Sequence, residues 1–63
     1  MWIKLTNFTD VLVNTDNIDY IYPAPKVGSI VVFHGIDQQK GVFVSETLDE
    51  IEAIIMEGGV NNV

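Results

Sequence analysis

Apolar and polar residues alternate along the first part of the chain in the manner of β-strands. Ile3 and Leu5 fall on one face of residues 2–5, and residues 11–13 alternate in the same way. The link at residues 6–10 is short and rich in turn-forming side chains. The pattern therefore predicts a hairpin of two short strands.

Three further strands are predicted downstream. Residues 14–17 favour a tight turn or one helical turn, because their side chains can bond their own backbone. A strand follows at 18–22 and stops at Pro23. Residues 29–34 are rich in β-branched and aromatic side chains, and 41–44 repeat this character; in both segments apolar residues occupy both faces.

The periodicity changes to that of a helix in the last third of the chain. Between residues 48 and 55 apolar side chains recur at helical spacing, and Thr47 with Glu50 fits a capping box. Gly58 and Gly59 supply the left-handed residues that commonly close a helix. Residues 60–63 are expected to form a frayed tail.

These elements predict an α+β fold in which residues 1–63 form a single domain. Four or five antiparallel strands form a meander, and one C-terminal α-helix packs across it. One helix can cover only one face of the sheet, so apolar groups on the other face require sheet curvature or a second subunit.

The size of the chain also favours self-association. A chain of 63 residues buries only about 60% of its unfolded surface, and this one has no cysteine for a disulfide. We therefore expect a homo-oligomer, most simply a dimer, with aromatic side chains at the contact because Tyr and Trp are enriched at interfaces. The candidate interface residues are Trp2, Tyr20, Tyr22 and Phe33.

Composition removes most catalytic chemistry. The chain lacks arginine and cysteine, and His34 is its single histidine. We interpret His34 as a half-buried strand residue bonded to a nearby carbonyl, since no G-x-S-x-G motif accompanies it. Glycine-rich phosphate motifs are also missing from the sequence. We predict a protein that is not an enzyme and has no cofactor.

Charge and hydropathy narrow the choice of partners. The net charge is −6, with three lysines against nine carboxylates. Four aspartates lie singly in predicted turns and do not have calcium-loop spacing, so no metal site is expected; these are Asp10, Asp16, Asp19 and Asp37. The acidic balance argues against nucleic acid and anionic membranes. Without a recognisable leader or spanning segment, we expect a cytoplasmic protein.

Acidic side chains gather on the predicted helix. Glu46, Glu50 and Glu57 lie within about 40° of each other around its axis, and Asp49 and Glu52 flank them without a balancing lysine. A solvated face that keeps the protein soluble explains this pattern. A docking face for a basic protein partner explains it as well, with Glu46, Asp49, Glu50 and Glu57 as the candidate partner-binding residues.

Several segments resemble the FlbD-type flagellar and swarming-motility proteins. They are Ile3-Lys4-Leu5-Thr6, Val13-Asn14, Asp16-Asn17-Ile18 with Tyr20-Ile21, Ile30-Val31-Val32 followed by Gly35, and Val44-Ser45-Glu46-Thr47-Leu48-Asp49-Glu50-Ile51. The resemblance spans almost the whole chain and implies a small regulatory protein without an active site.

The run from Asn17 to Ile51 is also similar to the middle of LytTR domains, which are sheet-based DNA binders. This chain lacks the basic residues that such a domain places on DNA. The leading hypothesis is therefore non-enzymatic regulation through protein contacts, and the FlbD-type resemblance implies a role in motility. The alternatives are an acidic inhibitor of a host nucleic-acid-binding or defence protein, of the kind that phages and mobile elements encode, and an oligomer that binds a small ligand between subunits.

We predict that the purified protein does not bind generic duplex DNA or single-stranded RNA at physiological salt, because its negative charge repels phosphates. Fluorescence polarisation with labelled oligonucleotides at micromolar protein tests this. A polarisation increase that weakens steeply with added salt would revive the LytTR-like interpretation.

Overall fold

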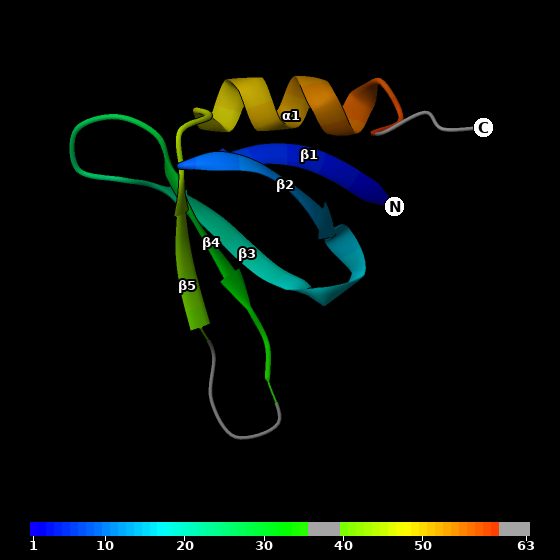
Figure 1. The fold of residues 1–63 in the computed structure, drawn as a ribbon, viewed down its shortest axis with the longest axis horizontal. Helices are drawn as coiled ribbons and strands as arrows, with labels where there is room; N and C mark the ends of the chain where they lie inside the picture. Colours follow the sequence, from blue (N-terminus) through cyan, green and yellow to red (C-terminus); the bar gives the residue numbers. More distant parts are fainter. Residues whose placement is uncertain (36–39, 60–63) are drawn as a thin grey trace.

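The computed structural model describes residues 1–35 and 40–59 and confirms the predicted α+β class, with five antiparallel strands followed by one C-terminal helix (Figure 1). The elements are β1 (Trp2–Asn7), β2 (Thr9–Asn14), the 3₁₀ turn η1 (Thr15–Asn17), β3 (Ile18–Pro23), β4 (Ser29–Phe33), β5 (Lys40–Val44) and α1 (Leu48–Met56). Residues 36–39, which include Asp37, and the predicted tail at 60–63 lie outside the described residues.

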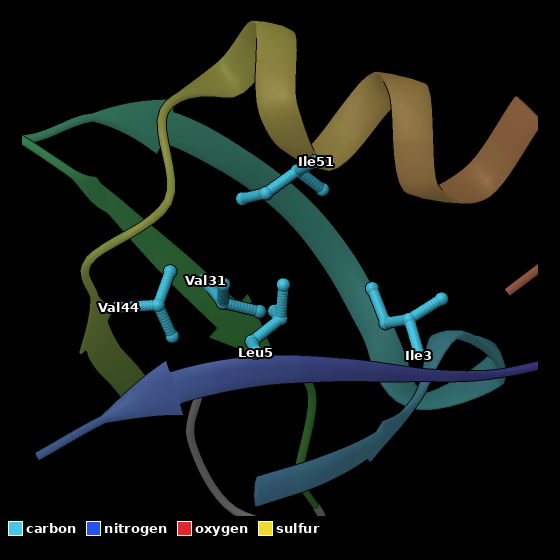
Figure 2. Packing of buried hydrophobic residues seen from close by; sticks show 5 residues of the cluster. All are labelled: Ile3, Leu5, Val31, Val44 and Ile51. Carbon is cyan, nitrogen blue, oxygen red and sulfur yellow. The ribbon is translucent and has the colours of Figure 1, made fainter. Parts of the chain in front are cut away.

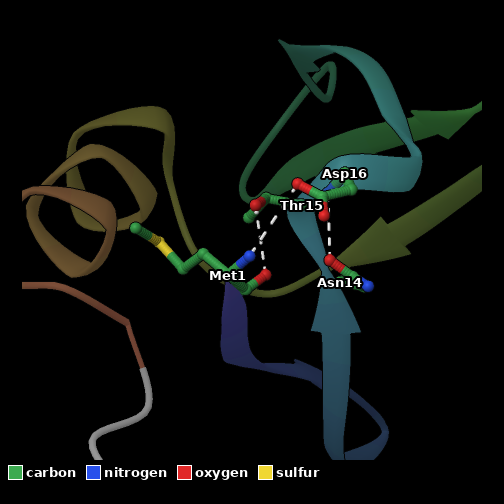
Figure 3. Close-up of polar contacts among 4 residues, drawn as sticks. All are labelled: Met1, Asn14, Thr15 and Asp16. Atoms are coloured by element: carbon green, nitrogen blue, oxygen red, sulfur yellow. Dashed lines mark hydrogen bonds and ion pairs between the residues drawn. The ribbon is translucent and has the colours of Figure 1, made fainter.

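The strands form two sheets instead of one continuous meander. β1 pairs with β2, and β3, β4 and β5 form a second sheet in that order. The single turn of η1 separates the sheets: Asn14 Oδ1 accepts from the Asp16 N–H at 3.1 Å, and the Thr15 N–H donates to the Met1 carbonyl at 2.8 Å (Figure 3). These bonds turn the chain out of the first sheet before β3 begins.

The first hairpin is tighter than predicted. Its ladder runs from the Trp2–Asn14 pair to the Asn7–Thr9 pair, so only Phe8 lies between the strands. The prediction of a link over residues 6–10 was wrong, because the polar residues of that stretch pair across the two strands, Thr6 with Asp10 and Asn7 with Thr9. Phe8 adopts a φ of 61°, and its side chain is 94% exposed at the tip of the hairpin.

A β-bulge changes which side chains of β3 face the core. Ile18 pairs with Phe33 and Tyr20 pairs with Val32, so Asp19 is one extra residue on β3. A regular strand would place Ile18 and Tyr20 on the same face. The bulge instead turns Ile18 toward the core and Tyr20 outward.

The core lies where α1, the β1–β2 hairpin and the larger sheet meet. Figure 2 shows Ile51 pointing from α1 toward Leu5 and Val31, with Ile3 and Val44 beside them. All five side chains are buried. The helix therefore covers only the face of the β3–β4–β5 sheet that carries Val31 and Val44.

Polar contacts join the end of β1 to the segment that leaves β5. The Ser45 N–H donates to the Thr6 carbonyl at 2.9 Å, and Asn7 Nδ2 donates to the Phe43 carbonyl at 2.6 Å. Glu46 accepts from both the N–H and the hydroxyl of Thr6, each at 2.9 Å. We call this set of contacts the β1–β5 junction. It fastens the hairpin to the second sheet.

The C-terminal end of α1 is closed by the predicted glycines. The Gly58 N–H donates to the Ile55 carbonyl and the Gly59 N–H to the Ile54 carbonyl, each at 3.0 Å, which is the Schellman pattern. Both glycines have positive φ, 96° and 71°. Gly59 also lies against β1, where a Cβ would collide with the Trp2 carbonyl oxygen.

Replacing Gly59 with alanine is expected to lower the free energy of unfolding more than replacing Gly58. The positive φ costs alanine about 1–2 kcal/mol at either position. At Gly58 nothing lies within 4 Å of the added Cβ, whereas at Gly59 the methyl group pushes the helix end away from β1. Urea denaturation of both variants measures the difference, and equal destabilisation would contradict the close approach of Gly59 to β1.

Candidate functional site

The face of the β3–β4–β5 sheet that points away from α1 is apolar and aromatic. Cross-strand partners lie on the same face, and the register places two rows of residues there. We call these six residues the outer face: Tyr20, Val32 and Gly41 in one row, and Tyr22, Ile30 and Phe43 in the next. None of them is charged, in a chain in which 19% of residues are charged.

Three aromatic rings stand on the outer face. Tyr20, Tyr22 and Phe43 are 51%, 46% and 37% exposed, and the rings of the two tyrosines lie 6.1 Å apart at an angle of 31°. Gly41 has no side chain, and Ile30 lies so close that a Cβ on Gly41 would be 3.1 Å from its Cγ2. The rings form most of the exposed part of this face, because Val32 on the same face is only 6% exposed.

The structure separates the four predicted interface residues. Tyr20 and Tyr22 share the outer face, while Phe33 packs against the core and Trp2 lies on the outside of the β1–β2 hairpin. Sequence reasoning missed Phe43. The alternation of residues 41–44 contained the signal, because it places Phe43 on the face opposite Val44.

A groove runs between α1 and β3 on the core side of the sheet. It has a volume of about 580 Å³ and is open to solvent along one side. Its apolar lining consists of Ile21, Leu48, Ile51, Ile55 and Met56. Asp49 and Glu52 add two carboxylates to the lining. We call this feature the α1–β3 groove.

The groove exists because α1 carries more apolar side chains than it buries against the rest of the protein. Among the residues of the helix only Ile51 is buried, and Ile54 packs against the core from a partly buried position. Leu48 and Ile55 are exposed, and Met56 is 78% exposed. Leu48, Ile51 and Ile55 follow i, i+3, i+7 spacing, so they form one apolar stripe along the helix.

The structure divides the predicted acidic stripe. Glu46 lies two residues before α1 and not on the helix face, because Thr47 is the N-cap and the Glu46 carboxylate binds Thr6. Glu50 completes the capping box: its Oε1 accepts from the Thr47 N–H at 2.9 Å, and Thr47 Oγ1 accepts from the Glu50 N–H at 3.2 Å. Glu57 is the C-cap, and Asp49 lies in the groove lining.

His34 has a structural contact that differs from the predicted one. It lies just beyond β4 and is exposed, and its Nδ1 bonds the carboxylate of Asp19, not a carbonyl group. The backbone N–H of His34 also donates to the Asn17 carbonyl at 3.2 Å. Both bonds flank the β3 bulge, so His34 helps to hold the bulge that turns Tyr20 outward.

Other kinds of site receive no support from the described residues. Across 1–35 and 40–59, no three His, Cys, Asp or Glu side chains gather closely enough to hold a metal ion. Within the same ranges no helix is long and apolar enough to cross a membrane. Comparison of the chain with protein-family models, curated proteins and solved structures finds no match.

Replacing Glu46 with alanine is expected to lower the free energy of unfolding by about 1.5–3 kcal/mol, because it removes a half-buried charged acceptor from two donors. Glu57→Ala is the control, since Glu57 is an exposed acidic residue at the far end of the helix. Thermal denaturation followed by circular dichroism measures both. Equal melting temperatures for the two variants would mean that the Glu46 carboxylate contributes no more to stability than an exposed carboxylate.

Proposed function

We propose that this protein is a small non-enzymatic regulatory protein that acts through protein contacts and forms a homodimer through its outer face. The outer face carries the proposal: two exposed tyrosines and a phenylalanine stand on an uncharged sheet surface that no other element covers in the described part of the chain. Aromatic residues on rigid strands give a large contact area at little cost in side-chain entropy.

The distribution of charged residues supports self-association through the outer face. Charged side chains are depleted from interface cores, and the outer face has none, although nine carboxylates lie elsewhere in the chain. Two copies facing each other through a twofold axis would bury the same rings on both sides and keep their acidic groups apart.

The resemblance to FlbD-type proteins supports a role in motility for such a dimer. The acidic inhibitor remains the alternative, and the gene neighbourhood distinguishes the two: flagellar genes favour the first and phage genes the second. A ligand-binding oligomer has weaker support, since the α1–β3 groove is open and small ligands favour enclosed pockets.

Light scattering coupled to size exclusion is expected to give about twice the monomer mass of 7.0 kDa at micromolar concentration. Tyr22→Lys places two like charges across the proposed contact, so we expect the dimer dissociation constant to rise about 10- to 100-fold. Leu12→Lys is the control, because Leu12 is also a large exposed side chain but lies on β2, with 59% exposure against 46% for Tyr22.

The results distinguish a dimer contact on the outer face from one on the hairpin and from no dimer. A monomeric mass for the wild type over the whole concentration range would refute the homodimer. Loss of the dimer in Leu12→Lys or Trp2→Lys, with Tyr22→Lys unaffected, would place the contact on the hairpin instead of the outer face. Circular dichroism of each variant confirms that the fold is retained.

A further inference from the structure

We infer that the α1–β3 groove is a docking site for a basic amphipathic helix of a protein partner. The inference rests on the proposed function as a protein-binding module, but it uses a different surface from the proposed dimer contact. Ile21 of β3 lines the groove, whereas Tyr20 and Tyr22 of the same strand point to the outer face. Both surfaces can therefore be occupied at once.

The shape of the groove fits a helix. The apolar stripe of α1 reaches the surface at Leu48 and Ile55, on either side of the buried Ile51, and these two residues lie about 10 Å apart along the helix axis. A second helix lying alongside α1 at the usual spacing of about 8–10 Å would place its own apolar residues into this stripe. Helix-in-groove recognition uses anchors at i, i+3, i+4 and i+7, which match that repeat.

The charges of the groove select a basic partner. Asp49 and Glu52 lie in its lining, and in the described part of the chain neither carboxylate has a hydrogen-bond or ion-pair partner. None of the three lysines lines the groove. Lysine or arginine residues that flank the apolar anchors of the incoming helix would meet these two carboxylates, as flanking charges do in coiled coils.

Other occupants fit less well. A second copy of this chain would bring its own acidic helix toward Asp49 and Glu52, which would repel it. An anionic membrane surface would be repelled by the same charges. A small molecule would remain largely exposed to solvent, because the groove is open.

The test uses the full chain and a labelled model peptide. The peptide has 14 residues, with leucine at helical i, i+3, i+4, i+7 spacing and lysine at the flanking positions. A second peptide keeps the leucines and replaces lysine with glutamate, and a third scrambles the first. Fluorescence polarisation at low and physiological salt measures affinity, and amide chemical-shift mapping locates the contact.

The paired variants test the charge and apolar parts separately. Asp49→Asn with Glu52→Gln removes the two groove carboxylates, and Asp10→Asn with Asp16→Asn removes two exposed carboxylates away from the groove, so net charge is matched. We expect the first pair to weaken binding of the lysine peptide about five- to tenfold and to flatten its salt dependence, and the second pair to change binding less than twofold.

Met56→Ser tests the apolar lining, with Leu12→Ser as its control, since both side chains are largely exposed. Only Met56→Ser is expected to weaken binding of the lysine peptide. Shifts along α1 and β3 support the inference. Equal binding of the lysine and glutamate peptides, equal losses in the two charge pairs, or no binding at 100 µM would overturn it.

Light scattering on the same samples keeps the two proposals separate. The groove variants are expected to remain dimeric, and Tyr22→Lys is expected to retain its peptide affinity within twofold. A monomer that binds the lysine peptide at the groove would refute the dimer and leave the docking site standing. A dimer that fails to bind the peptide would refute the docking site alone.

Discussion

The arrangement of this protein depends on the β1–β5 junction, where the carboxylate of Glu46 accepts from the N–H and the hydroxyl of Thr6. The two sheets share no continuous ladder, so this contact and its backbone neighbour, Ser45 to Thr6, fix the hairpin against the larger sheet. The buried side chains of β1 then reach those of β4, β5 and α1 in one small cluster (Figure 2). Because the bond involves a charged acceptor in a half-buried place, it is stronger than an ordinary surface contact.

The small core has a direct consequence for the surface. One hairpin and one nine-residue helix cover a single face of the three-stranded sheet, and its other face keeps the rings of Tyr20, Tyr22 and Phe43 exposed. The helix covers β1 with only part of its apolar arc, so the rest lines the α1–β3 groove. The two candidate surfaces thus arise from the same constraint: the chain contains more apolar surface than it can bury by itself.

Polar side chains near these surfaces have structural tasks as well. Glu46 holds the junction, Glu50 caps the helix and His34 binds Asp19 beside the β3 bulge. These contacts position the outer face and the groove. Asp49 and Glu52 have no such task and line an apolar surface, as the proposed docking site requires. The carboxylates that hold the fold are thus different residues from those on which the proposed docking site depends.

The sequence by itself determined the local structure of this protein. Thr47, Glu50 and the glycine pair set both ends of α1. Alternation of apolar residues located the first two strands, and β-branched and aromatic composition with bounding Pro and Gly located the other three. Capping, periodicity and local composition all depend on neighbours within a few positions. Only the tertiary structure decided the division into two sheets, the bulge that turned Tyr20 away from Ile18, and the pairing of Glu46 with Thr6 across 40 residues of sequence. The same long-range packing placed Phe33 against the core and Phe43 on the surface. Each of these outcomes depends on which distant segments meet, and a pattern of neighbouring residues does not contain that information.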